Sequence, residues 1–287
     1  MLRTTIGEFE LIHVTDGTFV LDGGVVFGAV PKVIWGKHHP TDEHNFLRFA
    51  LNCLIVRNDK RTILIETGAG PKLPPDMRQL YQTNSLLLKN LERIGFAPED
   101  FDAVINTHLH FDHCGWNTML RGDHLVPTFP RAQYYVQRGE VEHGRRRLER
   151  DRMSYRPENY EPLIEAGKMQ LLDGDCELFP GISVRVYPGH TRHLQAVLIR
   201  GGGQTACFVS DLIPSTYHLR PTWMMAYDLE PLVVIENRHR FYAEAIAQDW
   251  LVMFSHDLNV PWAHIRQDEK GKFTYHAPEL APAVRAA

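Results

Sequence analysis

The chain has 287 residues, of which 44% are hydrophobic, so it can bury one large core, and we expect a single domain over residues 1–287. Its formal net charge of −4 at pH 7 gives no positive field for nucleic acid or an anionic membrane surface, and we expect neither as a partner. No apolar run approaches the roughly 20 residues of a membrane span, and the first residues lack the pattern of a signal peptide.

The first part of the chain predicts an antiparallel sheet built from two hairpins. One is expected over residues 9–21 with its turn at Asp16-Gly17, and the other over residues 51–66 with its turn at residues 58–60. Between them, residues 22–47 are apolar, irregular and too long for a bare turn. We expect this segment to form a lid over a pocket or the contact of a homodimer.

Helical and strand patterns alternate after the second hairpin. Residues 75–94 carry leucines at mixed helical spacing and end near Gly95, which predicts a helix packed on the first sheet. Further apolar runs predict a second sheet, with Gly201-Gly202-Gly203 as a hairpin turn. These runs are residues 132–136, 169–172, 182–187, 196–200 and 205–209.

Two further segments and the cysteines have a distinctive composition. The basic run from Arg145 to Arg152 has interleaved acids, which favours a solvated helix face or an oligomer contact over a nucleic-acid site. The Ala/Pro-containing tail from Ala277 to Ala287 is expected to fray. The four cysteines include no CxxC pair, which indicates a reducing compartment and a cytoplasmic protein.

A cluster of histidines and a carboxylate follows the apolar run of residues 101–105. His108, His110, Asp112 and His113 fall within six positions, on a stretch where Gly115 permits the chain to turn. Histidine is the commonest protein ligand for borderline divalent metals, and this spacing on a loop aims four side chains into one small volume. Burying so many titratable groups without partners is costly, so the cluster predicts a metal site.

Three later polar residues follow short apolar runs of strand character. They are His190 in the sequence Pro-Gly-His-Thr, Asp211, and His256. Taken singly, each is as well explained as a helix cap, a loop histidine or a surface carboxylate. Taken in order, they complete a set of strand-end residues around one metal-binding edge.

This ordered set, HxHxDH, PGHT, an aspartate after a hairpin strand and a late histidine, resembles the metallo-β-lactamase-fold hydrolase superfamily over nearly the whole chain. The resemblance implies an α/β protein, a four-layer αββα sandwich of two mixed β-sheets flanked by helices. It also implies two divalent metal ions, zinc first with Mn, Co or Fe as alternatives, and a hydroxide that bridges them as the nucleophile. The implied ligands are His108, His110 and His190 for one ion, Asp112, His113 and His256 for the other, and Asp211 between them.

Within the superfamily, the segment from His256 to Arg266 and the run Asp211-Leu212-Ile213 are similar to methyl parathion hydrolase and its relatives. That branch lies close to the N-acyl-homoserine lactone lactonases. The resemblance implies a dinuclear hydrolase that opens lactones, including quorum-sensing-type acyl lactones, or cleaves aryl phosphotriesters, so the partner is a small-molecule ester, lactone or phosphotriester.

Several positions depart from the family pattern or fall beside it. Glu66-Thr67-Gly68 stands where the family has Asp-Thr-Gly. The Glu66 side chain is one methylene longer, so its hydrogen bonds to the metal loop must accommodate the extra length. His193 follows PGHT but matches no ligand position. Lactonases of this group carry a tyrosine three residues after the bridging aspartate, where this chain has Pro214. The expected catalytic and substrate-contact residues are Asp112 as proton shuttle, Tyr217 as oxyanion donor, and His218 and His264 near the substrate.

Other activities on the same fold remain open at this point. A thioesterase of the glyoxalase II type normally carries a C-terminal helical domain, and only about thirty residues follow His256. β-Lactamases are usually exported. An iron-dependent redox enzyme is the alternative from another class: His113, Asp211 and His256 together argue against its mononuclear form, and the missing flavin domain argues against its diiron form.

Overall fold

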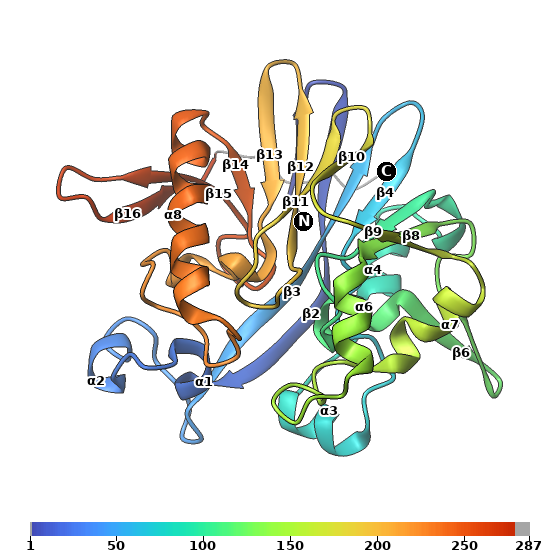
Figure 1. The fold of residues 1–287 in the computed structure, drawn as a ribbon, viewed down its shortest axis with the longest axis horizontal. Coiled ribbons are helices and arrows are strands. Elements are labelled where there is room, and N and C mark those ends of the chain that lie inside the picture. Colours follow the sequence, from blue (N-terminus) through green and yellow to red (C-terminus); the bar gives the residue numbers. More distant parts are fainter. Residues whose placement is uncertain (1, 279–287) are drawn as a thin grey trace.

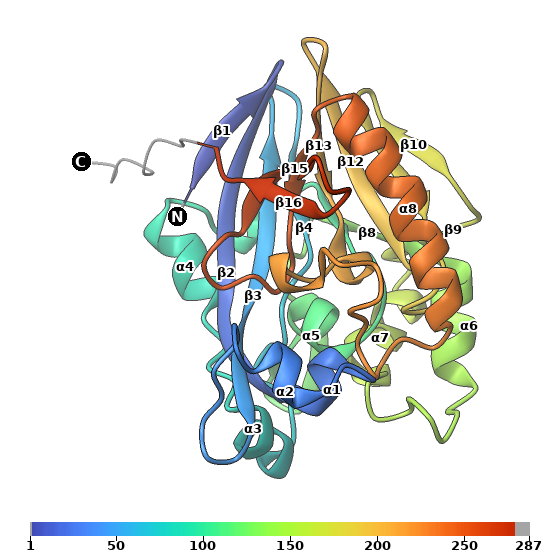
Figure 2. The same ribbon diagram turned by 90° about the vertical axis from the view of Figure 1, so that its left-hand side faces the viewer.

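The computed structural model describes residues 2–278, and the part of the tail beyond Pro278 lies outside the described residues. Two seven-stranded sheets stack face to face, with helix α4 (Leu87–Arg93) outside the first and α8 (Pro231–Ala247) outside the second (Figures 1 and 2). Both sheets mix parallel and antiparallel pairs. The expected four-layer αββα sandwich is confirmed.

The first sheet begins with three antiparallel strand pairs and ends with three parallel ones. In sheet order its strands are β1 (Arg3–Ile6), β2 (Phe9–Asp22), β3 (Phe46–Arg57), β4 (Thr62–Ile65), β5 (Ala103–Ile105), β8 (Gln133–Gln137) and β9 (Met169–Leu172). The placement of residues 132–136 and 169–172 in the second sheet was therefore wrong. Helical crossovers return both runs to the first sheet, and an apolar run does not reveal which sheet it joins.

The second sheet follows in sequence after the first is finished. Its strands are β10 (Cys176–Phe179), β11 (Ile182–Val186), β12 (Gln195–Gly201), β13 (Gln204–Phe208), β14 (Leu251–Met253), β15 (Trp262–Gln267) and β16 (Phe273–His276). The predicted glycine turn is confirmed, because Gly202 and Gly203 adopt positive φ angles of 57° and 76° between β12 and β13. A separate small sheet pairs β6 (Thr118–Arg121) with β7 (His124–Pro127).

The remaining helices are short. They are α1 (Gly23–Phe27), α2 (Lys32–Trp35), α3 (Pro75–Tyr81), α5 (Phe111–Cys114), α6 (Arg138–Arg145) and α7 (Glu161–Glu165). Helix α5 lies with α1 and α2 at one end of the sandwich (Figure 2). Within residues 2–278, every helix falls short of the length and apolar character needed to cross a membrane.

One hydrophobic core lies between the sheets and includes Leu54 and Ile105 of the first sheet and Val197 and Phe208 of the second. On the outer faces, α4 covers the first sheet with Leu87 and Leu91, and α8 covers the second with Phe241 and Tyr242. Because both faces of each central strand are covered, the strands are almost continuously apolar.

Two boundaries expected from the sequence were wrong, and Asp16 explains both. Strand β2 runs through Asp16-Gly17 without a turn and is only bulged between Thr15 and Thr18. Residues 75–94 form two helices rather than one, because the Asp16 carboxylate accepts a hydrogen bond from Leu87 N at 2.8 Å, at the start of α4. The same carboxylate accepts bonds from Trp116 Nε1 at 2.8 Å and Gly70 N at 3.0 Å.

The basic run also differs from expectation. Helix α6 ends at Arg145, so the rest of the run is a turn segment and not a helix face. In this segment Arg147 donates to the carbonyl of Tyr155 and Arg150 donates to the carbonyl of Ala226. These two side chains therefore fasten neighbouring loops.

Asp16→Ala is expected to lower the free energy of unfolding by about 3 to 5 kcal/mol, because three buried donors lose their acceptor. Urea unfolding followed by circular dichroism measures this change. Asp59→Ala, in an exposed turn, is the control and should change the free energy of unfolding by less than about 0.5 kcal/mol. A loss below about 1 kcal/mol for Asp16→Ala would contradict the role given to this network.

Candidate metal centre

The seven candidate ligands come from loops that follow strands of both sheets. The first four lie on the loop after β5 and on α5, and the others follow β11, β13 and β14. The structure brings all seven together in three overlapping groups whose ligand atoms lie within 4.8 Å of one another. The groups are His108, His110 and His190; His108, His113 and Asp211; and Asp112, His113 and His256.

The loop after β5 turns tightly, and Gly115 allows this by its small size. Its φ of −62° is ordinary for any residue, but a Cβ atom there would lie 1.9 Å from the carbonyl oxygen of Ala69. The Glu66 carboxylate accepts a hydrogen bond from Thr107 N at 2.8 Å, so the longer side chain still reaches the metal loop. Its other oxygen lies 3.6 Å from His113 Nδ1.

The first group has ring nitrogens with nothing to bond to. Nε2 of His108 and Nε2 of His110 are buried and have no hydrogen-bond partner within residues 2–278. His190 Nε2 lies 3.1 Å from His110 Nδ1. Burial together with the neighbouring imidazoles lowers the pKa of His108 and His110 well below the ordinary value, so both rings are neutral. Neutral rings with free lone pairs are what a divalent metal requires.

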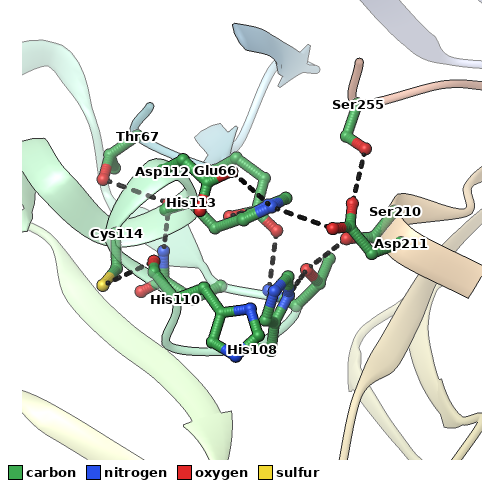
Figure 3. A network of polar contacts seen from close by, with 12 residues as sticks. Glu66, Thr67, His108, His110, Asp112, His113, Cys114, Ser210, Asp211 and Ser255 are labelled. Atoms are coloured by element: carbon green, nitrogen blue, oxygen red, sulfur yellow. Dashed lines mark hydrogen bonds and ion pairs between the residues drawn. The ribbon is translucent and has the colours of Figure 1, made fainter. Parts of the chain in front are cut away.

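The second group is built around His113 (Figure 3). Its Nε2 atom lies 3.2 Å from His256 Nε2 and 3.6 Å from Asp112 Oδ2. Asp211 lies between the groups, because its Oδ2 atom is 3.5 Å from His113 Nε2 and 3.4 Å from His190 Nε2. Ser255 donates to the other oxygen of Asp211 at 2.9 Å.

The protonation state of Asp211 suits a role as a metal ligand. Burial alone would raise the pKa of Asp211, but the imidazoles of His256 and His113 hold it well below the ordinary value. Its carboxylate is therefore ionised and able to bind a cation on both sides. Orphaned imidazole nitrogens and an ionised carboxylate in one buried volume fit two divalent ions, with zinc suited to this mixture of His and Asp.

A second buried carboxylate supports the loops and was missed in the sequence. Glu140, on α6, accepts hydrogen bonds from Leu109 N at 3.2 Å, Tyr155 Oη at 3.0 Å and Thr191 Oγ1 at 2.5 Å. It therefore joins the loop of His108 and His110 to the loop of His190. In the sequence Glu140 is one acid before a basic run, and nothing in its neighbours distinguishes it from a solvated residue.

A narrow cavity of about 40 Å³ lies over the cluster. Among the residues that the structure describes, the lining contains neither Lys nor Arg. Besides five candidate ligands, the lining consists of apolar, phenolic and hydroxyl side chains: Phe19, Leu21, Tyr81, Phe111, Ser154, Met225 and Tyr227. Burial raises the pKa of Tyr227, so its phenol stays protonated and can donate a hydrogen bond.

The other expected contact residues lie elsewhere. Tyr217 lines a separate surface groove with His39 and Trp223. His218 is buried, with its ring nitrogens 2.9 Å from Ser215 Oγ and 3.1 Å from the carbonyl of Val26. Neither side chain lines the cavity over the cluster.

Two further histidines are also outside the cavity. His264 pairs with Asp249 at 3.0 Å, and so does Arg266 at 2.7 Å. The ring of His193 packs over Gly139. The segment that carries Tyr217 does reach the cavity, but through Met225 and Tyr227.

Residues 22–47, expected to form a lid or a dimer contact, contain α1 and α2. These helices lie beside the part of the cavity wall formed by Met225 and Tyr227. Val26, Phe27 and Trp35 are buried in a core cluster with Trp223, and Ala226 N donates to the carbonyl of Val25 at 2.8 Å. These apolar residues therefore support the wall of the cavity from behind.

Comparison with known proteins agrees with this geometry. Residues 48–262 match the model of the metallo-beta-lactamase superfamily, and the chain belongs to that superfamily. A probable metal-dependent hydrolase from Staphylococcus aureus has the same fold, with a TM-score of 0.87, 26% identity, and coverage of 96% of this chain and 99% of that one. AidC, a dizinc quorum-quenching lactonase solved with a product, superposes with a TM-score of 0.81 at 21% identity over 98% of both chains.

Curated relatives match over a shorter region. An N-acyl homoserine lactonase from Bacillus cereus is 27% identical over 171 residues, which are 54% of this chain. The match spans 60% of the length of that lactonase. A second N-acyl homoserine lactonase, from Bacillus sp., is 27% identical over 159 residues and is matched over 57% of its length.

The buried ring of His218 makes stability depend on pH. Burial lowers its pKa from 6.5 to about 3, so the folded chain keeps the ring neutral while the unfolded chain protonates it as the pH falls below 6.5. The contribution of the neutral His218 ring to the free energy of unfolding is fully present above pH 6.5 and is lost as the pH falls towards 3. Between pH 8 and pH 5 the stability advantage of the wild type over His218→Gln should shrink by roughly 2 kcal/mol.

Urea unfolding of metal-free protein at the two pH values tests this. Ser215→Ala is the matched control, since it removes a hydrogen-bond partner of His218 but keeps the titrating ring and should retain the wild-type pH dependence. A stability gap that is the same at pH 8 and pH 5 for His218→Gln would contradict the assignment of a neutral buried ring.

Proposed function

We propose that the protein is a dinuclear metal-dependent hydrolase acting on neutral lactones, with acyl lactones as the native class. The observation that carries this proposal is the set of orphaned, neutral imidazole nitrogens of His108 and His110 beneath a cavity without cationic lining. His108, His110 and His190 would hold one ion, and Asp112, His113 and His256 the other, with Asp211 shared. When bound, divalent ions held by these residues would supply Lewis acidity, which would make a water molecule acidic enough to provide hydroxide near pH 7 and would polarise the substrate oxygen.

The side chains around the cavity perform the remaining steps. The Asp112 carboxylate lines the cavity, and we assign to it the transfer of a proton from the attacking oxygen nucleophile to the leaving alkoxide: it accepts the proton first and then donates it. For the oxyanion donor, the assignment moves from Tyr217 to Tyr227, because Tyr227 lines the cavity with a protonated phenol. His218 is given no contact with substrate. Ser154 is the other hydroxyl available to orient the ester.

The cavity walls favour a neutral substrate with an apolar group. Phe19, Leu21, Phe111 and Met225 contact an acyl or aryl substituent without supplying charge. A carboxylated β-lactam or a glutathione thioester brings negative charge beside Asp112 and finds no Lys or Arg in the lining. Neutral aryl phosphotriesters meet the same requirement as lactones and are the second candidate substrates.

The purified protein is expected to bind two zinc ions per chain, measured by elemental analysis after metal-replete purification. His110→Ala and Asp211→Ala should lose metal and abolish turnover while remaining folded, because each removes a proposed ligand. His193→Ala is the control and should keep both ions and its turnover. One ion or fewer in the wild type, or equal damage from His193→Ala and His110→Ala at equal metal content, would overturn the ligand assignment.

A substrate panel tests the reaction. We expect measurable hydrolysis of γ- or δ-lactones and aryl phosphotriesters, and little or none of β-lactams and glutathione thioesters. Tyr227→Phe should lower kcat on lactones by roughly 10- to 1000-fold through the loss of one hydrogen bond to the developing oxyanion. Tyr217→Phe, which alters a phenol outside the cavity, should leave kcat unchanged. The reverse ranking of the two variants would return the oxyanion role to Tyr217, and turnover restricted to β-lactams or thioesters would refute the substrate class.

A further inference from the structure

In His190 and His256, two of the proposed ligands, the Nδ1 atom points away from the cluster and faces a different kind of partner in each. His190 Nδ1 lies 2.9 Å from Oδ1 of Asp228, whereas His256 Nδ1 lies 2.9 Å from the backbone carbonyl of Ala50. Asp228 is only 4% exposed. One proposed ligand is therefore oriented by a buried carboxylate and the other by a neutral carbonyl.

The partner of Nδ1 decides which nitrogen of His190 carries the proton. A carboxylate accepts hydrogen bonds and donates none, so the proton of the neutral ring lies on Nδ1 and the lone pair on Nε2. That lone pair points into the cluster, since Nε2 is 3.1 Å from His110 Nδ1 and 3.4 Å from Asp211 Oδ2. A carboxylate partner also makes the imidazole a stronger electron donor to a metal.

Asp228 is itself held in place from three directions. Its second oxygen, Oδ2, accepts a hydrogen bond from Met225 N at 3.0 Å. The backbone beside it is joined to the loop of His190, because Leu229 N donates to the carbonyl of His190 at 3.2 Å. Glu230 N donates to the carbonyl of Gly189 at 2.8 Å. The carboxylate therefore has little freedom to leave His190.

We propose that Asp228 is a positioning residue that holds His190 in the Nδ1-protonated tautomer and so raises the affinity of the metal site formed with His108 and His110. The proposal rests on the dinuclear function proposed above. It predicts an asymmetric effect, because the site of Asp112, His113 and His256 contains no ligand bonded to Asp228.

Asp228→Asn tests the proposal with almost no change in shape. The amide oxygen of Asn can still accept from Met225 N, but its N–H₂ group then faces His190 Nδ1 and favours the opposite tautomer, with the proton on Nε2. Zinc titration of metal-free protein against a chelating indicator should show one ion bound about 10- to 100-fold more weakly and the other unchanged. Asp228→Glu, which keeps a carboxylate, should recover part of the lost affinity.

Nitrogen-15 NMR of the histidine rings gives a readout that packing alone would not move. The carboxylates of Asp211 and Asp228 raise the pKa of His190 against the effect of burial, so the spectra are recorded at an alkaline pH at which the metal-free ring is neutral. There we expect the single ring proton of His190 on Nδ1 in the wild type and on Nε2 in Asp228→Asn. Glu230→Gln is the matched control, since it removes the same charge from an exposed ion pair with Arg192 two residues along and should leave both the tautomer and the zinc affinities unchanged.

Three results would overturn the proposal: a neutral His190 ring with its single proton on Nε2 in the metal-free wild type, wild-type affinity for both ions in Asp228→Asn, or equal weakening at both sites. The wild-type tautomer is informative even where the Asn variant does not fold. A wild type that binds no zinc would refute the dinuclear function instead, and the tautomer measurement, made without metal, separates the two failures.

Discussion

Five imidazoles and two carboxylates lie in contact at one end of the sandwich, and the cost of burying them governs the structure around them. The loops that carry the candidate ligands are held by hydrogen bonds from side chains that are not themselves members of the cluster. Glu140 joins two of these loops through Leu109 and Thr191. On the opposite side, Asn52 donates to the carbonyls of Phe254 and Asp257 and so ties the loop of His256 to the first sheet. The rigidity of the centre thus comes from hydrogen bonds made outside it.

The cluster of candidate ligands was predictable from sequence because four of its members are close in the chain and each of the others follows a recognisable strand. The residues that support or complete it were not. Glu140 meets Thr191 across 51 positions, and Asp228 meets His190 across 38. Nothing near either acid in the chain signals the distant partner. Tyr217 was expected as the oxyanion donor because Pro214 occupies the position of the tyrosine found in related lactonases, whereas the path of the chain brings Tyr227 to the cavity.

The fold errors have the same origin. The two runs assigned to the wrong sheet, at residues 132–136 and 169–172, have the apolar character of any buried strand, and only long-range pairing decides their sheet. Asp16-Gly17 has the composition of a tight turn, yet the Asp16 carboxylate is used by Leu87 and Trp116 and the strand continues through it. The two apolar runs do form strands, as predicted, whereas the turn predicted at Asp16-Gly17 does not form.

The order of strands along the chain has a consequence for biosynthesis. The first sheet ends at Leu172 and the second begins at Cys176, so every strand of the first is made before any strand of the second. A nascent chain that reaches this point exposes the apolar inner face of a finished sheet, including Leu54 and Ile105, until the later strands arrive to cover it. That interval is when aggregation competes with folding. It closes only when the second sheet docks, which is also when His190 meets His110.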